Sequence, residues 1–214
     1  MATDVVVFFA LKREARPFRR LCPAVPVMLT QVGVERARIA VETYLQSHSP
    51  KLLILAGFGG ALSPSLAVGD VIVAKDVIAE DGTISQCHPV PDANGRILTV
   101  NRMIATVEEK KLLGTKHSAA VCDMESSVVA ELCRRHGVPF LAVRAVSDDA
   151  KHSLSPTLDR IIVNGKVSAW QVLRAIVTEP TILRDFRRLA RGTKRAAERQ
   201  ALRLKSLIDQ SSLS

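Results

Sequence analysis

The stretch "HSAAVCDMESSVVAELCRRHGVPFLAVRAVSDDA" (His117–Ala150) decides the fold class, because it predicts a strand, a helix and a second strand in direct succession. The apolar run ending at Asp123 predicts a buried strand. The next segment predicts a helix that Asp123 caps and Gly137 closes. "VPFLAVRAVSD" predicts the second buried strand. Buried strands joined by helices are typical of an α/β protein with a mostly parallel sheet covered on both faces.

The same alternation runs through the rest of the chain. A helix is predicted over "GVERARIAVETYLQSHS" (33–49), a glycine turn over Gly57–Gly60 and a loop over "GTISQCHPVPDANG" (82–95). The other predicted strands are "DVVVFFAL" (4–11), "AVPVMLTQ" (24–31), "KLLILAGFGG" (51–60), "GDVIVAKDVIAED" (69–81) and "RILTV" (96–100).

The C-terminal segment differs in kind. "TILRDFRRLARGTKRAAERQALRLKSLIDQ" (181–210) has apolar residues at helical spacing among many arginines. We therefore expect an α/β domain over residues 1–180 and a basic helix over 181–214, packed on the same domain or on a partner subunit. Contact with an anionic membrane is the alternative.

Composition limits the function classes. The chain has 214 residues, 47% of them hydrophobic, which suits one soluble domain with a sizeable core. Its net charge of +9 predicts an anionic partner. Four cysteines without CxxC spacing predict free thiols in a reducing cytosol and no metal site. With no signal-peptide pattern and no run of ~20 apolar residues, we expect a cytoplasmic protein. One Trp, one Tyr and no nucleic-acid motif leave a nucleic-acid-binding protein as a distant alternative.

Polar residues follow four of the predicted strands, and ligands of such folds bind outside the carboxyl ends of the strands. They are Glu14, the glycines at 57–60, the segment Asp123–Glu125 and the segment Ser147–Asp149. Each has a structural alternative: Glu14 and Glu125 as helix-start carboxylates, the glycines as a plain turn, and the aspartates as caps. Adjacent Asp148 and Asp149 would repel, and desolvation would raise the pKa of one of them.

Three segments together resemble the nucleoside phosphorylase and nucleosidase superfamily, in particular its methylthioadenosine/S-adenosylhomocysteine nucleosidase branch. They are "FFALKREARPF" (8–18), "LILAGFGGALSPSLAVGDVIVA" (53–74) and "AVCDMESSVVAELCRRHGVPFLAVRAVSDDA" (120–150). The resemblance covers about residues 4–150 in the expected order. It implies a three-layer α/β/α sandwich around a mixed, largely parallel sheet, and cleavage of the N-glycosidic bond between ribose and a purine.

The resemblance also implies roles for single residues. Asp148 matches the acid that protonates the purine at N7, and Ser147 orients it. Glu125 matches the glutamate that binds the ribose hydroxyls, and Met124 packs on the sugar. Glu14 matches the base that activates the attacking water. No cofactor or metal is implied, and family members are commonly homo-oligomers.

The choice between water and phosphate stays open, because the sequence departs from the family where the second substrate sits. "QVG" (31–33) replaces a G-I-G pattern, and Phe58 replaces a serine. The glycines Gly57 and Gly59 would let either group approach the backbone. Phosphate as a co-substrate would need arginines, and Arg13 and Arg36 are the candidates. Glu14 favours hydrolysis. By its distance from Glu125, the segment with Arg102 and Met103 is expected to wall the base.

A narrower resemblance concerns the substrate. "GVERA" (33–37), "TVNRMIAT" (99–106), "CDMESS" (122–127) and the basic C-terminal helix are similar to the hopanoid-associated phosphorylases of bacteria. This similarity implies release of adenine from adenosylhopane, a lipid-linked nucleoside, to leave a ribosyl-hopane, and gives the helix a peripheral membrane role. A methylthioadenosine/S-adenosylhomocysteine nucleosidase and a phosphate-using purine nucleoside phosphorylase are the alternatives.

Overall fold

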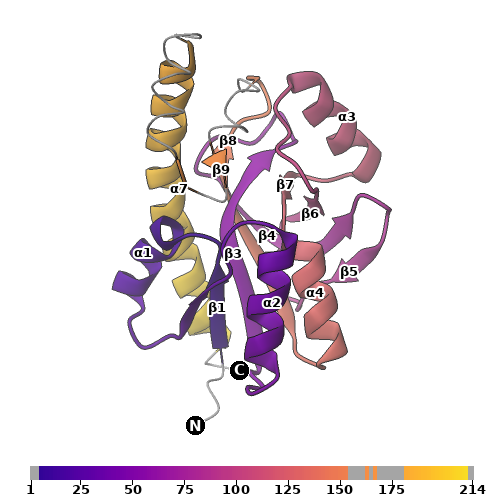
Figure 1. Ribbon diagram of the computed structural model, residues 1–214, viewed down its shortest axis with the longest axis vertical. Helices are drawn as coiled ribbons and strands as arrows, with labels where there is room; N and C mark the ends of the chain where they lie inside the picture. The colour runs from indigo at the N-terminus through magenta and orange to yellow at the C-terminus, as the bar shows by residue number, and fades with distance from the viewer. Residues whose placement is uncertain (1–4, 154–161, 164–165, 168–180, 212–214) are drawn as a thin grey trace.

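The computed structural model describes residues 5–153, 162–163, 166–167 and 181–211, and Figure 1 shows their arrangement. One mixed sheet forms the centre, with the strand order β2-β1-β3-β7-β6-β4-β5, and β8 pairs with both β3 and β4. Its strands are β1 (Val5–Phe9), β2 (Val27–Leu29), β3 (Leu52–Ala61), β4 (Val71–Ala79), β5 (Ile84–Gln86), β6 (Gly95–Thr99), β7 (Val121–Asp123) and β8 (Phe140–Asp148). A separate two-stranded pairing joins β9 (Ile162–Val163) and β10 (Lys166–Val167).

Parallel pairing dominates the middle of the sheet. β1 pairs in parallel with β2 and β3, and β3 pairs in parallel with β8. β4 pairs in parallel with β6 but antiparallel with β8 and β5, and β7 is antiparallel to β3. The carboxyl ends of β1, β3 and β8 therefore meet at one edge of the sheet. The predicted fold class, an α/β fold with a mixed, largely parallel sheet, is confirmed.

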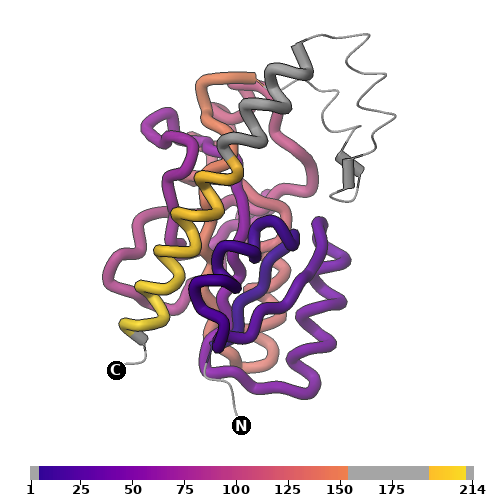
Figure 2. The backbone as a smooth tube through the Cα atoms, turned by 90° about the vertical axis from the view of Figure 1, so that its left-hand side faces the viewer, coloured from indigo at the N-terminus to yellow at the C-terminus, as the bar shows by residue number. Residues whose placement is uncertain are grey.

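Helices cover both faces of this sheet. α1 (Lys12–Leu21) and α7 (Thr181–Ser211) pack together on one face, while α2 (Val34–Leu45) and α4 (Ser126–Arg135) pack together on the other. Figure 2, turned by a quarter, shows the sheet between these two helix pairs. The core is made of the apolar strand residues predicted from the sequence, such as Val6–Phe9, Leu53–Ala56 and Leu141–Val143, all at most 1% exposed.

The predicted glycine turn after the third strand is wrong. β3 runs without a break through Gly57–Gly60, and its pairing with β8 continues as far as Asp148. These glycines have ordinary negative backbone angles, so a turn is not what requires them. Space requires them: a Cβ on Gly59 would lie 2.9 Å from the Cys122 carbonyl oxygen. Because glycine has no side chain, polar groups of neighbouring segments can lie close to this part of β3.

Two elements between β4 and β7 differ from the predictions. The expected loop over residues 82–95 contains β5, which pairs with β4 at the edge of the sheet. α3 (Val107–His117) follows β6 and has no counterpart among the predicted elements. Its sequence, "VEEKKLLGTKH", buries only Lys110, Leu113 and His117, so the apolar periodicity that signals a helix is weak. Thr106 caps it by accepting a hydrogen bond from the Glu109 N–H.

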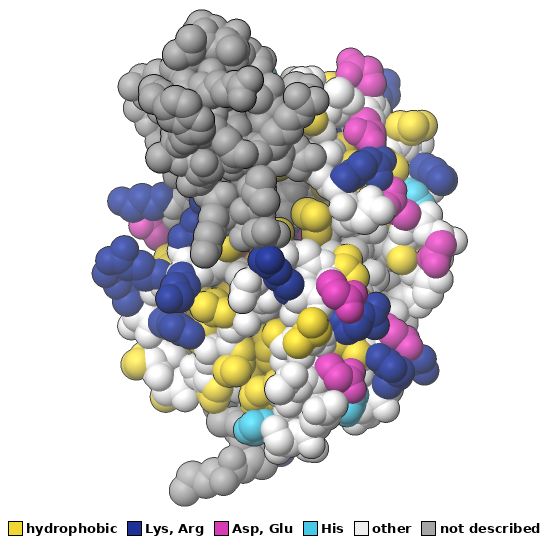
Figure 3. Space-filling model, in the orientation of Figure 1, with side chains coloured by type: hydrophobic (Ala, Val, Ile, Leu, Met, Phe, Trp, Pro, Cys, Tyr) yellow, Lys and Arg dark blue, Asp and Glu magenta, His cyan; other side chains and the backbone are white. Residues whose placement is uncertain are grey.

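The C-terminal helix contacts the domain core directly. α7 packs on α1 and β8 and buries small and branched side chains, namely Ala196, Ala197, Ala201, Leu204 and Leu207. The domain limit predicted at residue 180 lies outside the described residues. Cationic side chains gather on the side of the molecule where α1 lies (Figure 3), in keeping with the exposed Lys12, Arg13, Arg16 and Arg20. Over the described ranges, no helix combines the length and apolar character needed to cross a membrane.

Candidate active site

A cavity of about 210 Å³ opens at the carboxyl ends of β1, β3 and β8. This is where parallel α/β sheets bind ligands, because the strand ends and the loops after them enclose a hollow there. Its walls are largely apolar, and carboxylates of three different segments reach into it. The sequence-predicted residues that line it are Arg13, Glu14, Gly57, Phe58, Gly59, Arg102, Met103, Met124, Glu125, Ser147 and Asp148.

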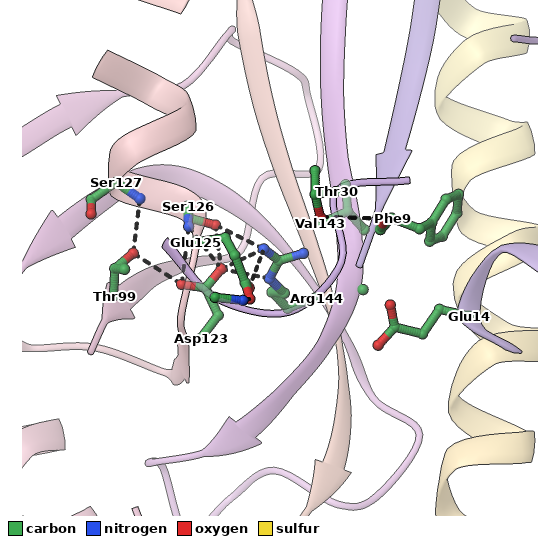
Figure 4. A network of polar contacts seen from close by, with 12 residues as sticks. Phe9, Glu14, Thr30, Thr99, Asp123, Glu125, Ser126, Ser127, Val143 and Arg144 are labelled. Atoms are coloured by element: carbon green, nitrogen blue, oxygen red, sulfur yellow. Dashed lines mark hydrogen bonds and ion pairs between the residues drawn. The ribbon is translucent and has the colours of Figure 1, made fainter. Parts of the chain in front are cut away.

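A buried arginine organises the floor of the cavity. Arg144, on β8, is 2% exposed, and its guanidinium pairs with Asp123 at 2.5–2.7 Å. It also lies 4.0 Å from the Glu125 carboxylate and faces Glu14 from the other side (Figure 4). One buried cation thus faces three carboxylates. Their negative charge exceeds what Arg144 can neutralise, so this part of the cavity favours protonated carboxyl groups.

Asp123 is the structural member of this cluster. Its carboxylate accepts hydrogen bonds from the Ser126 N–H, the Ser126 hydroxyl and the Thr99 hydroxyl. Thr99 in turn accepts from the Ser127 N–H. The predicted N-cap is therefore displaced, because Glu125 and not Asp123 occupies that position, but Asp123 still accepts from the first N–H of α4 and also pairs with Arg144. Asp123 thereby fixes the start of the helix and the guanidinium together.

Glu125 is held at the cavity by the glycine that precedes α2. The Gly33 N–H donates to its Oε1 at 2.9 Å, and the side chain is almost fully buried. Burial, with the nearby Asp123 charge, raises the pKa of Glu125 to about 7, although Arg144 opposes the shift. Glu125 occupies the N-cap position of α4 but makes no capping bond with its side chain. The exposed helix-dipole alternative therefore does not describe it.

Glu14 faces the cavity from α1. It is 4% exposed, and its Oε2 accepts a hydrogen bond from the Leu11 N–H at 3.0 Å. The alternative of a solvated helix-start carboxylate is therefore wrong. Burial raises the pKa of Glu14, and the Leu11 bond and the Arg144 charge only partly offset that rise. A carboxyl group with a raised pKa is a better proton acceptor near neutrality than an ordinary glutamate.

Gly57 lets Glu14 and Arg144 approach one another. A Cβ at this position would lie 3.1 Å from an Arg144 terminal nitrogen and 3.3 Å from Glu14 Oε2. Gln200 of α7, which is fully buried, supports the same stretch from behind: its Nε2 donates to the carbonyls of Gly57 and Val143 at 2.7 and 3.0 Å. The glycine and the glutamine together place the third strand close against the buried charges.

A bulge at the end of β8 presents Ser147 and Asp148. Gly59 pairs with Val146 and Gly60 with Asp148, so Ser147 is the extra residue. Bulges of this kind re-aim side chains next to functional sites. The Ser147 hydroxyl donates to Asp148 Oδ1 at 3.0 Å, a contact compatible with the orienting role that the family resemblance implies. A Cβ on Gly60 would lie 3.3 Å from Asp148 Oδ2, so this glycine also makes room for the acid.

The two adjacent aspartates face different partners. Asp148 Oδ2 accepts from the Lys110 ammonium at 2.7 Å. Asp149 Oδ1 instead accepts from the Lys151 N–H at 3.0 Å and contacts the His152 ring at 2.7 Å. Asp149 therefore interacts with the segment that follows it, which matches its structural alternative.

The remaining predicted residues divide by their contacts. Phe58, Met103 and Met124 line the cavity as apolar walls, and Arg13 lines it as a cation. Arg102 also lines it, but its guanidinium pairs with Glu80 and Glu109, at 2.9 and 2.6 Å. Arg36 is not among the lining residues, and it donates to the Gln31 side chain at 3.1 Å. The structure thus brings the predicted site residues to one cavity, except Arg36 and Asp149.

Sequence reasoning missed three polar residues that the site uses. Arg144 stands inside an apolar strand, and a charged residue in such a run is a signal that could have marked it. Lys110 and Gln200 lie on helices amid many other polar residues, where no local pattern distinguishes them. The four cysteines are free, as predicted. Burial raises the pKa of the Cys122 thiol, at the cavity wall, to about 12, which leaves it uncharged at neutral pH.

Carboxyl groups gathered at the carboxyl edge of a mixed sheet, one accepting from a serine and two with raised pKa values, are the arrangement expected of an α/β enzyme. The chain belongs to the Phosphorylase superfamily, because the sequence model of that family matches residues 20–94 and 85–177.

Relatives with known names are nucleosidases. The chain is 26% identical over 182 residues to the 5′-methylthioadenosine/S-adenosylhomocysteine nucleosidase of Shewanella halifaxensis, a match that covers 69% of this chain and 79% of the relative. It is 27% identical over 186 residues to the nucleosidase of the same name from Staphylococcus aureus, covering 72% of this chain and 82% of the relative.

Solved structures share the fold. The 5′-methylthioadenosine/S-adenosylhomocysteine nucleosidase of Helicobacter pylori superposes with a TM-score of 0.74 at 15% identity, covering 98% of this chain and 100% of that one. The futalosine hydrolase of the same organism superposes with a TM-score of 0.72, also at 15% identity, covering 96% and 97%. At this level of identity the structures support the fold alone.

Proposed function

We propose that this chain cleaves the N-glycosidic bond of an adenine nucleoside and releases adenine. The observation that carries the proposal is the placement of Asp148, Glu125 and Glu14 around one cavity, each from a different segment. Family membership and the nucleosidase relatives support the same reaction.

The charges of the site suit this reaction. As the bond breaks, positive charge develops on the ribose and negative charge on the purine. Asp148 donates a proton to purine N7, with Ser147 holding the carboxyl group in place. Glu125 binds the ribose hydroxyls and places a carboxylate near the developing cation. An acid and a carboxylate at opposite ends of one transition state follow the logic of glycoside hydrolysis.

Water is the nucleophile that the site favours. Glu14 is buried at the cavity with a raised pKa, which suits a base that accepts a proton from water near neutrality. The water oxygen bonds to the ribose C1′, and its proton passes to Glu14. Phosphate is the alternative, and among the two arginines considered for it only Arg13 lines the cavity.

For the substituent at the sugar 5′ position, we propose a hopanoid lipid, so that the substrate is adenosylhopane and the product a ribosyl-hopane. The resemblance of segments 33–37, 99–106 and 122–127 to hopanoid-associated phosphorylases supports it, and the last two of these segments contribute residues to the cavity wall. The apolar Val32, Val100 and Ile104 in the cavity wall are compatible with such a group. The second candidate is a methylthioadenosine/S-adenosylhomocysteine nucleosidase, which the named relatives favour.

Two further features belong to this proposal. A lipid substrate would be met at a membrane, and the exposed Lys194 and Arg195 of α7 offer cations to anionic headgroups. The active form is proposed to be a homo-oligomer. Sedimentation with vesicles of phosphatidylglycerol, against phosphatidylcholine vesicles as the control, tests the first feature, and light scattering after gel filtration tests the second.

The test is adenine release by the purified protein from adenosine, methylthioadenosine, S-adenosylhomocysteine and adenosylhopane, each with and without phosphate. We expect adenine in phosphate-free buffer and fastest turnover of adenosylhopane. A preference for methylthioadenosine would replace the lipid substrate with the second candidate. Release that requires phosphate would replace hydrolysis with phosphorolysis.

A further inference from the structure

A buried lysine contacts the proposed acid. Lys110, on α3, is 0% exposed, and its ammonium donates to Asp148 Oδ2 at 2.7 Å. The same ammonium donates to the carbonyl oxygens of Asp149 and His152, at 2.8 and 3.4 Å. All three N–H groups of the ammonium therefore have acceptors. Burying a lysine without water is costly, and this site compensates with one carboxylate and two carbonyls.

The lysine lies behind the acid and not in the cavity. Asp148 lines the cavity with a side chain that is 15% exposed, whereas Lys110 is not among the lining residues. Among the described residues, the other polar groups near Asp148 are the Ser147 hydroxyl and the Cys122 thiol, and the nearby Asp149 carboxylate and His152 ring contact each other. Within this part of the chain, Lys110 is the charged group that donates a hydrogen bond to Asp148.

This contact bears on the proposed reaction, because a carboxylate paired with an ammonium has no proton of its own to give. We propose that Lys110 supplies the proton that Asp148 passes to the purine, so that the Lys110–Asp148 pair, and not Asp148 alone, acts as the acid. The inference rests on the proposed function. Lys110 acts through Asp148 and does not touch the substrate, which makes it a positioning and proton-supplying residue.

The proton transfers balance. As the C1′–N9 bond breaks, its electrons move into the purine ring and N7 becomes basic. The Lys110 N–H bond first breaks as an Asp148 O–H bond forms, and that O–H bond then breaks as the N7–H bond forms. The carboxylic acid therefore exists only between the two transfers. The neutral Lys110 amine regains its proton from solvent after adenine has left.

The experiment compares two substrates in Lys110→Met. Adenosine derivatives need a proton on the leaving group, whereas 4-nitrophenyl β-riboside releases a phenolate that leaves without one. Lys111→Met is the matched control, because Lys111 is the exposed neighbour on the same helix. We expect Lys110→Met to release adenine about 100-fold more slowly at pH 8 and to cleave the riboside at close to the wild-type rate. The control should match wild type on both substrates.

The pH profile gives the second readout. Without Lys110, Asp148 must carry its own proton, so the alkaline limb of adenine release should move to lower pH and activity should recover in acid. The ratio of the two substrate rates does not depend on the folded fraction, so partial misfolding cannot imitate the result. In the wild type, the rate of adenine release should fall at a lower alkaline pH than the rate of riboside cleavage, because only adenine release needs the proton of Lys110.

The outcomes separate the two proposals. If wild type releases adenine but Lys110→Met slows both substrates equally, or slows neither, Lys110 has no part in proton supply and only this inference fails. The same holds if the wild-type rates on both substrates fall together at alkaline pH. If wild type releases no adenine from any nucleoside, the proposed function fails and this inference fails with it.

Discussion

Replacing Glu125 by glutamine should change how stability depends on pH. The wild-type carboxyl group is buried beside Asp123, and its pKa is raised from 4.5 to about 7. Folded protein therefore holds this proton to higher pH than the unfolded chain does. The contribution of Glu125 to the free energy of unfolding must then fall as pH rises from about 4.5 to about 7 and stay level above that. Glutamine keeps an oxygen for the Gly33 N–H but cannot ionise.

The magnitude follows from the two pKa values. The full effect is about 3 kcal/mol, and most of it falls between pH 5 and pH 8.5. Relative to wild type, Glu125→Gln should thus gain about 2–3 kcal/mol in unfolding free energy when the pH is raised from 5 to 8.5. Only the difference between the two pH values matters, so any pH-independent cost of the substitution cancels.

Urea unfolding at pH 5 and pH 8.5, followed by circular dichroism, measures this difference. Glu131→Gln is the control on the same helix, because Glu131 is partly exposed and its pKa is lowered by the hydrogen bond from Arg134. That control should show a small change of opposite sign. If wild type and Glu125→Gln show the same pH dependence, Glu125 is not held protonated by burial and the reasoning about the charge cluster is wrong.

Four further substitutions test the site. Asp148→Asn should slow adenine release by ~10²–10⁴ if it carries the proton to the purine, and a near-normal rate would refute that role. Glu14→Gln should abolish hydrolysis; product formation that depends on phosphate and survives this change would exclude water as the nucleophile. Gly57→Ala would place a methyl group 3.1 Å from Arg144 and 3.3 Å from Glu14, so kcat/KM should fall roughly tenfold. An unchanged kcat/KM would show that activity does not require the close contact between Glu14 and Arg144. Gln200→Leu leaves two strand carbonyls without this donor and should lower the free energy of unfolding by about 1–3 kcal/mol, measured by urea unfolding; no loss would mean that Gln200 does not anchor α7.

Local patterns predicted the fold well where apolar runs are long. β1, β3, β4 and β8 each bury a continuous run, and strand ends that meet at one edge follow from parallel topology. The pattern failed at Gly57–Gly60, because glycines in sequence indicate a turn, whereas here they make room for Cys122 and the buried charges beside the strand. Only the tertiary structure shows that close packing, and not a turn, requires these glycines.

The candidate site was predictable where a functional residue lies at or shortly after the end of a strand. Asp148 ends β8, Glu125 and Glu14 follow β7 and β1 within a few residues, and each of the three lies at the cavity. Their partners come from elsewhere: Lys110 lies 38 positions from Asp148, on a helix whose weak amphipathic pattern gave no sign of it. Burial also reversed an expectation, since Glu14 proved enclosed where a helix-start carboxylate is usually solvated. Long-range pairing and burial are properties of tertiary packing, which local sequence does not encode.

The most direct test of the central claim is chromatographic measurement of free adenine after incubating the purified protein with adenosine derivatives in phosphate-free buffer, beside Asp148→Asn as the matched control. The account predicts adenine in stoichiometric amount with the freed sugar from wild type, and a rate at least ~10²-fold lower from the variant. No adenine from any derivative, with or without added phosphate, would contradict it.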